Sequence, residues 1–403
     1  MIRRVLYLRS LAAAGEAAIE LSLVIVVWQA THSGLALGGM LAIPWMSSLA
    51  SQGLAPLWID RVGRLAAMQW ANRIRAILAA IAAIALIGLN TGTALLGLLA
   101  GLLAGIAMSQ NAHNDAFQAL APTIAQAVHL DLRTLVSRIQ IAESLAAGGV
   151  YASGALWLLA GGSPLGLWAV AAGAFGVAGL RRLAPASAPS LPLQDRSDPG
   201  AYRTIGTFWH DHPMVLTWTL ISGVLSAAIA GANVLLAPAL SQLWGISVAG
   251  GYGWVLLAIA VGGVVGGKMV GHPRWNRLAL AQRVQIAVSG LGLIFIAVSL
   301  VHHIVIALEL LMLSGIAAAL MARAVALTIQ EAAPEAMRGR VMAIRALGML
   351  LGAGVGSVIA GMFVQWWGAQ TALTGWGLGL VGLAIFARGS RSWGSGRRIL
   401  PMR

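Results

Sequence analysis

The sequence predicts an all-α membrane protein whose twelve transmembrane helices form two six-helix bundles, with the N and C termini in the cytoplasm. Three observations predict this class: the composition, the length of the apolar runs and the distribution of positive charge. Of the 403 residues, 59% are hydrophobic and 9% are charged, and the mean hydropathy is +0.84. A water-soluble fold could not bury this much apolar surface, so the chain is expected to lie in a lipid bilayer.

The apolar residues form twelve runs that are long enough to cross a membrane, since a transmembrane helix needs about 20 residues. The expected spans cover about residues 5–31, 35–58, 68–89, 93–122, 134–161, 164–183, 212–238, 246–267, 278–301, 303–330, 341–367 and 369–388.

Positive charge is confined to one set of connections between these spans. All 26 Lys and Arg residues lie in, or within a turn or two of, the N-terminus, the even-numbered loops and the C-terminus, and the odd-numbered loops contain none. Because Lys and Arg mark the cytoplasmic face, a multi-pass protein of the inner (plasma) membrane with both termini inside is expected. The net charge of +14 is therefore a topology signal, and its dispersal along the chain argues against a nucleic-acid partner.

The first span contains two glutamates, Glu16 and Glu20, that are four residues apart and thus share one helix face. A charged side chain in the middle of a membrane helix costs about 2.5–3.5 kcal/mol on insertion scales. No Lys or Arg is expected at their depth except Arg138, which is closer to the surface. The two carboxylates are therefore predicted to share a proton or to bind a cationic group of a substrate. The alternative is that one glutamate bonds a neighbouring helix and the other is idle.

The connection between the second and third spans is a short polar hairpin. Asp60 can accept hydrogen bonds at a helix end, Arg61 and Arg64 can hold the cytoplasmic side, and Gly63 permits a tight turn. This segment resembles the Asp-Arg-x-Gly-Arg hairpin of the major facilitator superfamily. The resemblance implies that these four residues form a cytoplasmic gate, although Pro56 stands where the superfamily usually has a glycine.

Further polar residues are expected inside the membrane in the fourth and fifth spans. The fourth span has a polar stripe at helical spacing, formed by Asn111, Asn114, Asp115 and Gln118. In the fifth span, Glu143 follows Gln140 on the same side. At about 1.5 Å per residue, Asp115 and Glu143 lie at roughly the depth of Glu16. Alternatively, Glu143 pairs with Arg138, and Asp115 forms a structural network with its neighbouring asparagines.

The two halves divide at a segment rich in Pro, Ser, Asp and Arg. The predicted organisation is an N-terminal bundle at 1–183, a cytoplasmic linker at 184–208, a C-terminal bundle at 209–388 and a cytoplasmic tail at 389–403. An internal repeat supports this division. Thr123-Ile124, Arg133, Val136 and Ile139 recur 205 residues later as Thr328-Ile329, Arg338, Val341 and Ile344. Repeats at corresponding positions of two halves are typical of transporters.

The C-terminal half offers fewer polar candidates, with Asn233 in the seventh span and Glu309 in the tenth. The stretch before the eleventh span, which includes Arg338 and Arg340, resembles the corresponding loop of drug and siderophore exporters of the superfamily. The resemblance implies that these two arginines belong to the cytoplasmic gate. The first span, from Arg9 to the end of its outer turn, is similar to that of the enterobactin exporters.

These observations predict a secondary transporter rather than an enzyme. The sequence contains no Cys, no catalytic triad and no nucleotide-binding loop, so no metal or cofactor is expected. The resemblance implies alternating access about a cavity lined by the first, fourth, seventh and tenth spans. The hypothesis is proton-driven efflux of a small amphipathic compound, drug-like or siderophore-like, by a monomer whose partners are substrate, protons and lipid. Uptake of a siderophore or metal chelate, and a non-transporting receptor or scaffold, are the alternatives.

Overall fold

The computed structural model describes residues 2–88, 92–180, 210, 213–269, 277–278, 280–332 and 335–389, and these residues form helices with no strand among them. The helices are α1 (Ile2–Thr31), α2 (Gly34–Ser51), α3 (Ala55–Val62), α4 (Arg64–Gly88), α5 (Thr93–Ala127), α6 (Leu132–Leu159), α7 (Pro164–Leu180), α9 (Pro213–Gln242), α10 (Val248–Met269), α12 (Leu280–Leu300), α13 (Ile304–Ala332) and α14 (Glu335–Gly389). The predicted linker at 184–208 and all but the first residue of the predicted tail at 389–403 lie outside the described residues.

The helices match the twelve predicted spans. Within the described ranges, nine helices are long and apolar enough to cross a membrane, and α7 is a shorter apolar helix. The 55 residues of α14 contain a break at Gly368, whose φ of 74° favours glycine, so this element holds two spans. With α6, which is 28 residues long, the spans are α1, α2, α4 to α7, α9, α10, α12, α13 and the two parts of α14. The predicted fold class is confirmed.

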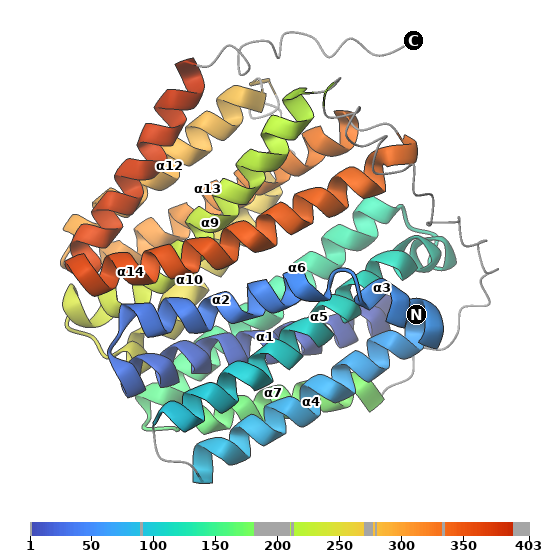
Figure 1. The fold of residues 1–403 in the computed structure, drawn as a ribbon, viewed down its shortest axis with the longest axis horizontal. Helices are drawn as coiled ribbons and strands as arrows, with labels where there is room; N and C mark the ends of the chain where they lie inside the picture. The colour runs from blue at the N-terminus through green and yellow to red at the C-terminus, as the bar shows by residue number, and fades with distance from the viewer. Residues whose placement is uncertain are drawn as a thin grey trace.

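Packing divides the spans into two bundles (Figure 1). In the N-terminal bundle, α1 packs against α6 and α7, α4 packs against α5 and α7, and α2 packs against α5. In the C-terminal bundle, α14 packs against α9 and α12, and α13 packs against α10 and α12. The bundles meet mainly along two helix pairs, α2 with α14 and α6 with α10, and less along α1 and α2 with α9 and α1 with α10.

The second span is shorter than predicted. It ends at Ser51 rather than near residue 58, because the chain turns at 52–54 and starts the separate helix α3. Pro56 lies in the first turn of α3, where its missing N–H costs no hydrogen bond. Gly63 ends α3 with a φ of 84°. The predicted tight turn at Gly63 is confirmed, and the polar hairpin is a short helix followed by this turn.

The two bundles are in closest contact at one end. The Cα of Gly38 in α2 faces the backbone of Ser357 and Gly361 in α14, and Gly253 in α10 faces the backbone of Tyr151 in α6. All these residues lie in the halves of their helices that lead to the Lys- and Arg-free turns. We call this end of the molecule the outer end. Figure 1 shows that α2 and α14 converge toward this end and diverge toward the other. With the outer end outside the cell, as the charge distribution predicts, the arrangement is inward-facing.

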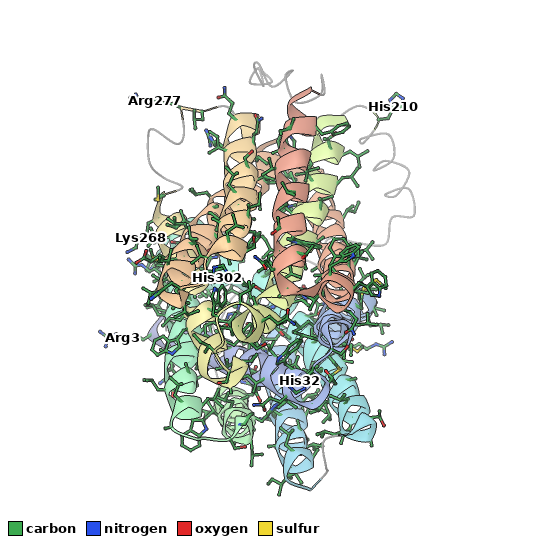
Figure 2. All side chains as sticks on the ribbon, turned by 90° about the vertical axis from the view of Figure 1, so that its left-hand side faces the viewer. Arg3, His32, His210, Lys268, Arg277 and His302 are labelled. Carbon is green, nitrogen blue, oxygen red and sulfur yellow. The ribbon has the colours of Figure 1, made fainter. Side chains whose placement is uncertain are left out.

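Figure 2 looks onto the outer end, where His32 and His302 lie within the outline of the bundles, whereas Arg3 and Lys268 project from its edge. Ser33 also crosses the bundle boundary at this end, because its hydroxyl donates to Oε1 of Gln365 at 2.9 Å. Polar and small residues thus close the outer side.

Cysteine labelling should establish the orientation. Because the chain has no native Cys, His302→Cys and Val62→Cys each introduce a unique thiol. A membrane-impermeant maleimide added to intact cells is expected to label the first variant and not the second. The reverse pattern would place the Lys- and Arg-rich face outside.

Candidate functional site

A cavity of about 390 Å³ lies between α1, α5 and α6 of the N-terminal bundle. Its polar lining is contributed by Arg9, Glu16 and Glu20 on α1, Asn114 on α5, and Gln140, Glu143, Ser144 and Tyr151 on α6. The three α1 residues lie seven and four positions apart, about two turns and one turn of helix, with small alanines between them, so one face of α1 presents both glutamates to the cavity. The carboxylates of Glu16, Glu20 and Glu143 thus lie on the wall of one cavity, whereas Asp115, which was expected to reach the cavity with Glu16 and Glu20, is not part of its lining.

One ion pair ties the three helices together. Nε of Arg9 donates to Oε1 of Glu143 at 2.5 Å, and its Nη1 donates to Oδ1 of Asn114 at 3.0 Å. The guanidinium also lies 4.6 Å from the centre of the Phe117 ring, a cation–π contact. The alternative that Glu143 pairs with Arg138 is wrong, since the partner of Glu143 among the described residues is Arg9. Arg9 therefore neutralises Glu143 and fixes α1 against α5 and α6.

A second ion pair corrects the expectation that Glu16 has no cation nearby. Nη1 of Arg75 donates to Oε1 of Glu16 at 2.7 Å, although the two residues are on different helices, α4 and α1. The Arg75 side chain is 0% exposed, whereas that of Glu16 is 32% exposed. Arg75 also donates to Oδ1 of Asn72 and lies 4.5 Å from the centre of the Phe175 ring. A buried guanidinium requires such partners, and Glu16 supplies the only charged one among the described residues.

Glu20 is the cavity carboxylate without a cation. The hydroxyl of Tyr151 donates to its Oε2 at 2.6 Å, and no Lys or Arg lies within ion-pair distance of it in the described part of the chain. Three glutamates and two arginines thus leave one negative charge in this group, and it belongs to Glu20. Such a carboxylate can take up a proton or bind a cationic group.

The side chains of the polar stripe in the fourth span contact different neighbouring helices. Asn114 bonds Arg9 in the cavity, whereas Asn111 accepts from Nε2 of Gln52 at 2.9 Å and donates to Oγ of Ser51 at 3.1 Å. Asn111 therefore joins α5 to the end of α2 and does not line the cavity. Asp115 is half-buried on α5 and is not part of the lining.

The two candidates of the C-terminal half do not line this cavity either. Asn233 is half-buried on α9, and its backbone carbonyl accepts from the hydroxyl of Tyr252 at 3.3 Å. Glu309 is exposed near the outer start of α13. The cavity is thus built from the N-terminal bundle alone.

The predicted gate residues lie at the end opposite to the outer closure. Asp60, Arg61 and Gly63 are exposed, and Nη1 of Arg64 donates to the carbonyl of Ala119 on α5 at 3.2 Å. No ion pair involves Asp60 over the residues that the structure covers. The side chains of the other two predicted gate residues, Arg338 and Arg340, lie outside the described residues.

Sequence reasoning missed three participants: Arg9, Arg75 and Tyr151. Tyr151 is two turns after Glu143 on α6, so helical periodicity could have placed it on the cavity face. Arg9 and Arg75 sit near cytoplasmic helix starts and were interpreted as topology signals. Their long side chains reach inward, which periodicity does not reveal.

The sequence matches no protein-family model and no curated protein. Its structure is similar to several solved transporters over nearly their whole length. The nucleoside transporter NupG has a TM-score of 0.74 at 13% identity, covering 97% of this chain and 99% of that chain. A bacterial homolog of the human lysosomal transporter Spinster, in an inward-facing and unoccupied conformation, has 0.69 at 15% identity, covering 100% and 98%. A D-xylose-proton symporter has 0.67 at 15%, covering 99% and 98%.

At such low identity the likeness establishes the fold alone. The chain has the twelve-helix fold of the major facilitator transporters. The finer resemblance to enterobactin exporters stays a prediction.

Proposed function

We propose that this chain is a secondary transporter that exports a small amphipathic compound by alternating access, in exchange for protons. The observation that carries the proposal is Glu20, a carboxylate on the wall of a cavity of about 390 Å³ that has a tyrosine partner and, among the described residues, no cation partner. The fold supports transport as the general activity, since the similar solved structures are transporters.

The coupling site proposed from the sequence is narrowed by the contacts. Glu16 is paired with Arg75 and Glu143 with Arg9, so both are neutralised in this arrangement. Only Glu20 remains to exchange a proton for a cationic group, with Tyr151 holding the carboxylate in place. A proton arriving at Glu20 would remove the charge that holds a cationic substrate, which is the competition that an antiporter needs.

The lining fits an amphipathic cation. Alanines at positions 12, 13, 17 and 147 provide apolar wall between the charged groups. Such a wall accepts an apolar body without specific bonds, while Glu20 attracts the cationic end. The inward-facing arrangement leaves this cavity on the side from which an exported compound would enter.

The test replaces Glu20 in purified protein reconstituted into liposomes. Glu20→Gln keeps the size and the hydrogen bond from Tyr151 but cannot lose or gain the charge. We expect it to abolish transport of a cationic dye, the methyl ester of rhodamine B, driven by a pH gradient, while dye exchange without a gradient persists at dye concentrations that compensate for the weaker binding. Glu309→Gln is the matched control, since Glu309 is exposed near the outer end. Normal gradient-driven transport by Glu20→Gln would contradict the coupling role.

The direction of transport is tested in whole cells. Export predicts that expression of the protein lowers dye accumulation and that a proton uncoupler restores it. Higher accumulation would indicate uptake, a direction that the similarity to a proton symporter keeps open. No change in either condition would indicate a receptor or scaffold.

A further prediction concerns the hairpin between α3 and α4. Asp60 is exposed in the inward-facing arrangement, where its partner surface is separated, and we propose that it bonds across the cytoplasmic side when that side closes. Asp60→Asn should then slow transport by about tenfold, since a hydrogen bond to a charged group contributes about 1.5–3 kcal/mol. Initial transport rates at equal protein amounts in the membrane measure this, and an unchanged rate would leave the hairpin an ordinary loop.

A further inference from the structure

Arg345 is a charged residue of the C-terminal bundle that the proposed function does not use. It lies in the first part of α14 and is half-buried. Its Nε donates to Oγ of Ser222 on α9 at 3.1 Å, and the hydroxyl of Ser222 in turn donates to the carbonyl of Trp218. Both ion pairs of the described residues are in the N-terminal bundle, so Arg345 has no carboxylate partner among these residues. A charged side chain at such a position in a membrane helix raises the free energy of insertion, so such a residue is expected to have a function.

The internal repeat relates Arg345 to a residue of the cavity wall. The shift of 205 residues that relates α6 to α14 places Arg345 at the position of Gln140, and Gln140 lines the cavity. The packing follows the same relation. Helix α6 packs against α1 of its own bundle and α10 of the other, and α14 packs against α9 of its own bundle and α2 of the other.

The polar contacts follow the repeat as well. Arg9 and Glu143 join α1 to α6, and Ser222 and Arg345 join α9 to α14. Figure 1 shows the first part of α14 on the side of the C-terminal bundle that faces α2. Arg345 therefore occupies the place in its bundle that a cavity-lining residue occupies in the other.

We propose that Arg345 is a second pole of the substrate site and binds an anionic oxygen group of the substrate, such as a carboxylate, so that the transported compound is zwitterionic. This inference rests on the proposed function and specifies its substrate class. Glu20 on the N-terminal bundle then holds the cationic end and Arg345 on the C-terminal bundle the anionic end. With Nε bonded to Ser222, the two terminal amino groups of the guanidinium remain available for a bidentate carboxylate.

A bound zwitterion would also link the bundles. One molecule held by α1 on one side and α14 on the other contacts both moving parts, so its binding energy differs between the inward-facing and the closed arrangement. A ligand shifts a conformational equilibrium only through such a difference. A compound with a cationic end alone would contact mainly the N-terminal bundle.

The test uses two dyes that differ in one group. Rhodamine B has a free carboxylate and a cationic ring system, and its methyl ester has the ring system alone. Binding to the purified protein is measured by tryptophan quenching and transport in liposomes. The wild type is expected to bind the acid more tightly than the ester. Arg345→Gln should lose about tenfold in affinity for the acid and little for the ester, and Arg345→Lys should keep part of it, because an ammonium supplies the charge without the fork.

Two controls separate the alternatives. Ser222→Ala removes the bond between α9 and α14 but leaves the charge, so a merely structural role of Arg345 predicts that it matches Arg345→Gln in stability and in dye binding. The substrate role predicts that Ser222→Ala keeps the preference for the acid. Glu20→Gln should weaken both dyes, since both have the cationic ring system.

The outcomes are distinguishable. Equal loss of both dyes in Arg345→Gln, no loss of either, or a wild type that does not prefer the acid would overturn the second pole. If the ester is still transported and depends on Glu20, the proposed function stands without it. A wild type that binds neither dye would overturn both proposals.

Discussion

Gly38→Leu is expected to drive the protein out of the inward-facing arrangement, whereas Gly39→Leu is expected to leave it nearly unchanged. A β-carbon at Gly38 would overlap the carbonyl oxygen of Ser357 in α14, and that carbonyl is backbone and cannot turn away like a side chain. A β-carbon at the adjacent Gly39 would have no atom within 4 Å. The two variants add the same apolar group to the same helix, so only the Gly38 variant wedges α2 and α14 apart.

The size of the effect follows from the cost of overpacking. Forcing atoms into a filled contact costs about 1–3 kcal/mol, which corresponds to a shift of about 5- to 150-fold in a two-state equilibrium. The added side chain raises the free energy of the inward-facing state by this amount, but it does not raise the free energy of a state in which α2 and α14 are separated at the outer end. Transport should fall because the outer side no longer closes.

Spin labels on the outer ends of the two helices measure this shift. Leu35 on α2 and Trp366 on α14 are both exposed, and the chain has no native Cys to interfere. The distance distribution between labels at these positions should move to longer values in Gly38→Leu and stay in place in Gly39→Leu. If the distance distribution and the melting temperature of Gly38→Leu were both unchanged, α2 and α14 would accommodate the larger side chain without separating.

The spans were predictable from the sequence because a helix in lipid is defined by the length and apolarity of one continuous segment. Each backbone group must be bonded within its helix, so length and apolarity suffice to place α1 or α13. The end of the second span was not predictable in this way. Leu57 and Trp58 are apolar enough to continue a span. The chain nevertheless turns before Pro56, and length and apolarity alone do not reveal such a turn inside an apolar run.

The sequence predicts several residues that line the cavity, but it does not predict which of them form ion pairs. Helical periodicity puts Glu16 and Glu20 on one face, yet it does not give the rotation of α4 about its axis, which brings Arg75 to Glu16. Arg9 and Glu143 are likewise 134 residues apart. An ion pair between helices is a property of packing, so a reading based on depth alone left Glu16 without its cation. Glu309 was a candidate because it is one of the few strongly polar residues of the C-terminal spans, and its side chain is exposed near the outer start of α13.

The Glu16–Arg75 pair leads to the second large effect, in which the two partners are expected to be unequal. Glu16→Gln leaves the guanidinium of Arg75 0% exposed, with the neutral Asn72 and the Phe175 ring as its remaining contacts. Removing one partner of a buried pair costs about 3–5 kcal/mol. Because Gln still accepts a hydrogen bond, we expect a loss near the lower end of this range.

Arg75→Met should cost less, even though it removes the larger side chain. The carboxylate that it leaves behind belongs to Glu16, which is 32% exposed on the wall of the cavity and can be hydrated there. Methionine keeps much of the volume of the arginine stem in the apolar interior. The double variant Glu16→Gln/Arg75→Met contains no unpaired charge, so it should be more stable than Glu16→Gln alone. Such a recovery gives a coupling energy that independent sites would not show.

Thermal unfolding of the three variants in one detergent, at one pH, measures this order of stability. If Arg75→Met were the least stable of the three, the carboxylate of Glu16 would be the member of the pair that cannot reach water, and the cavity would have to end before it.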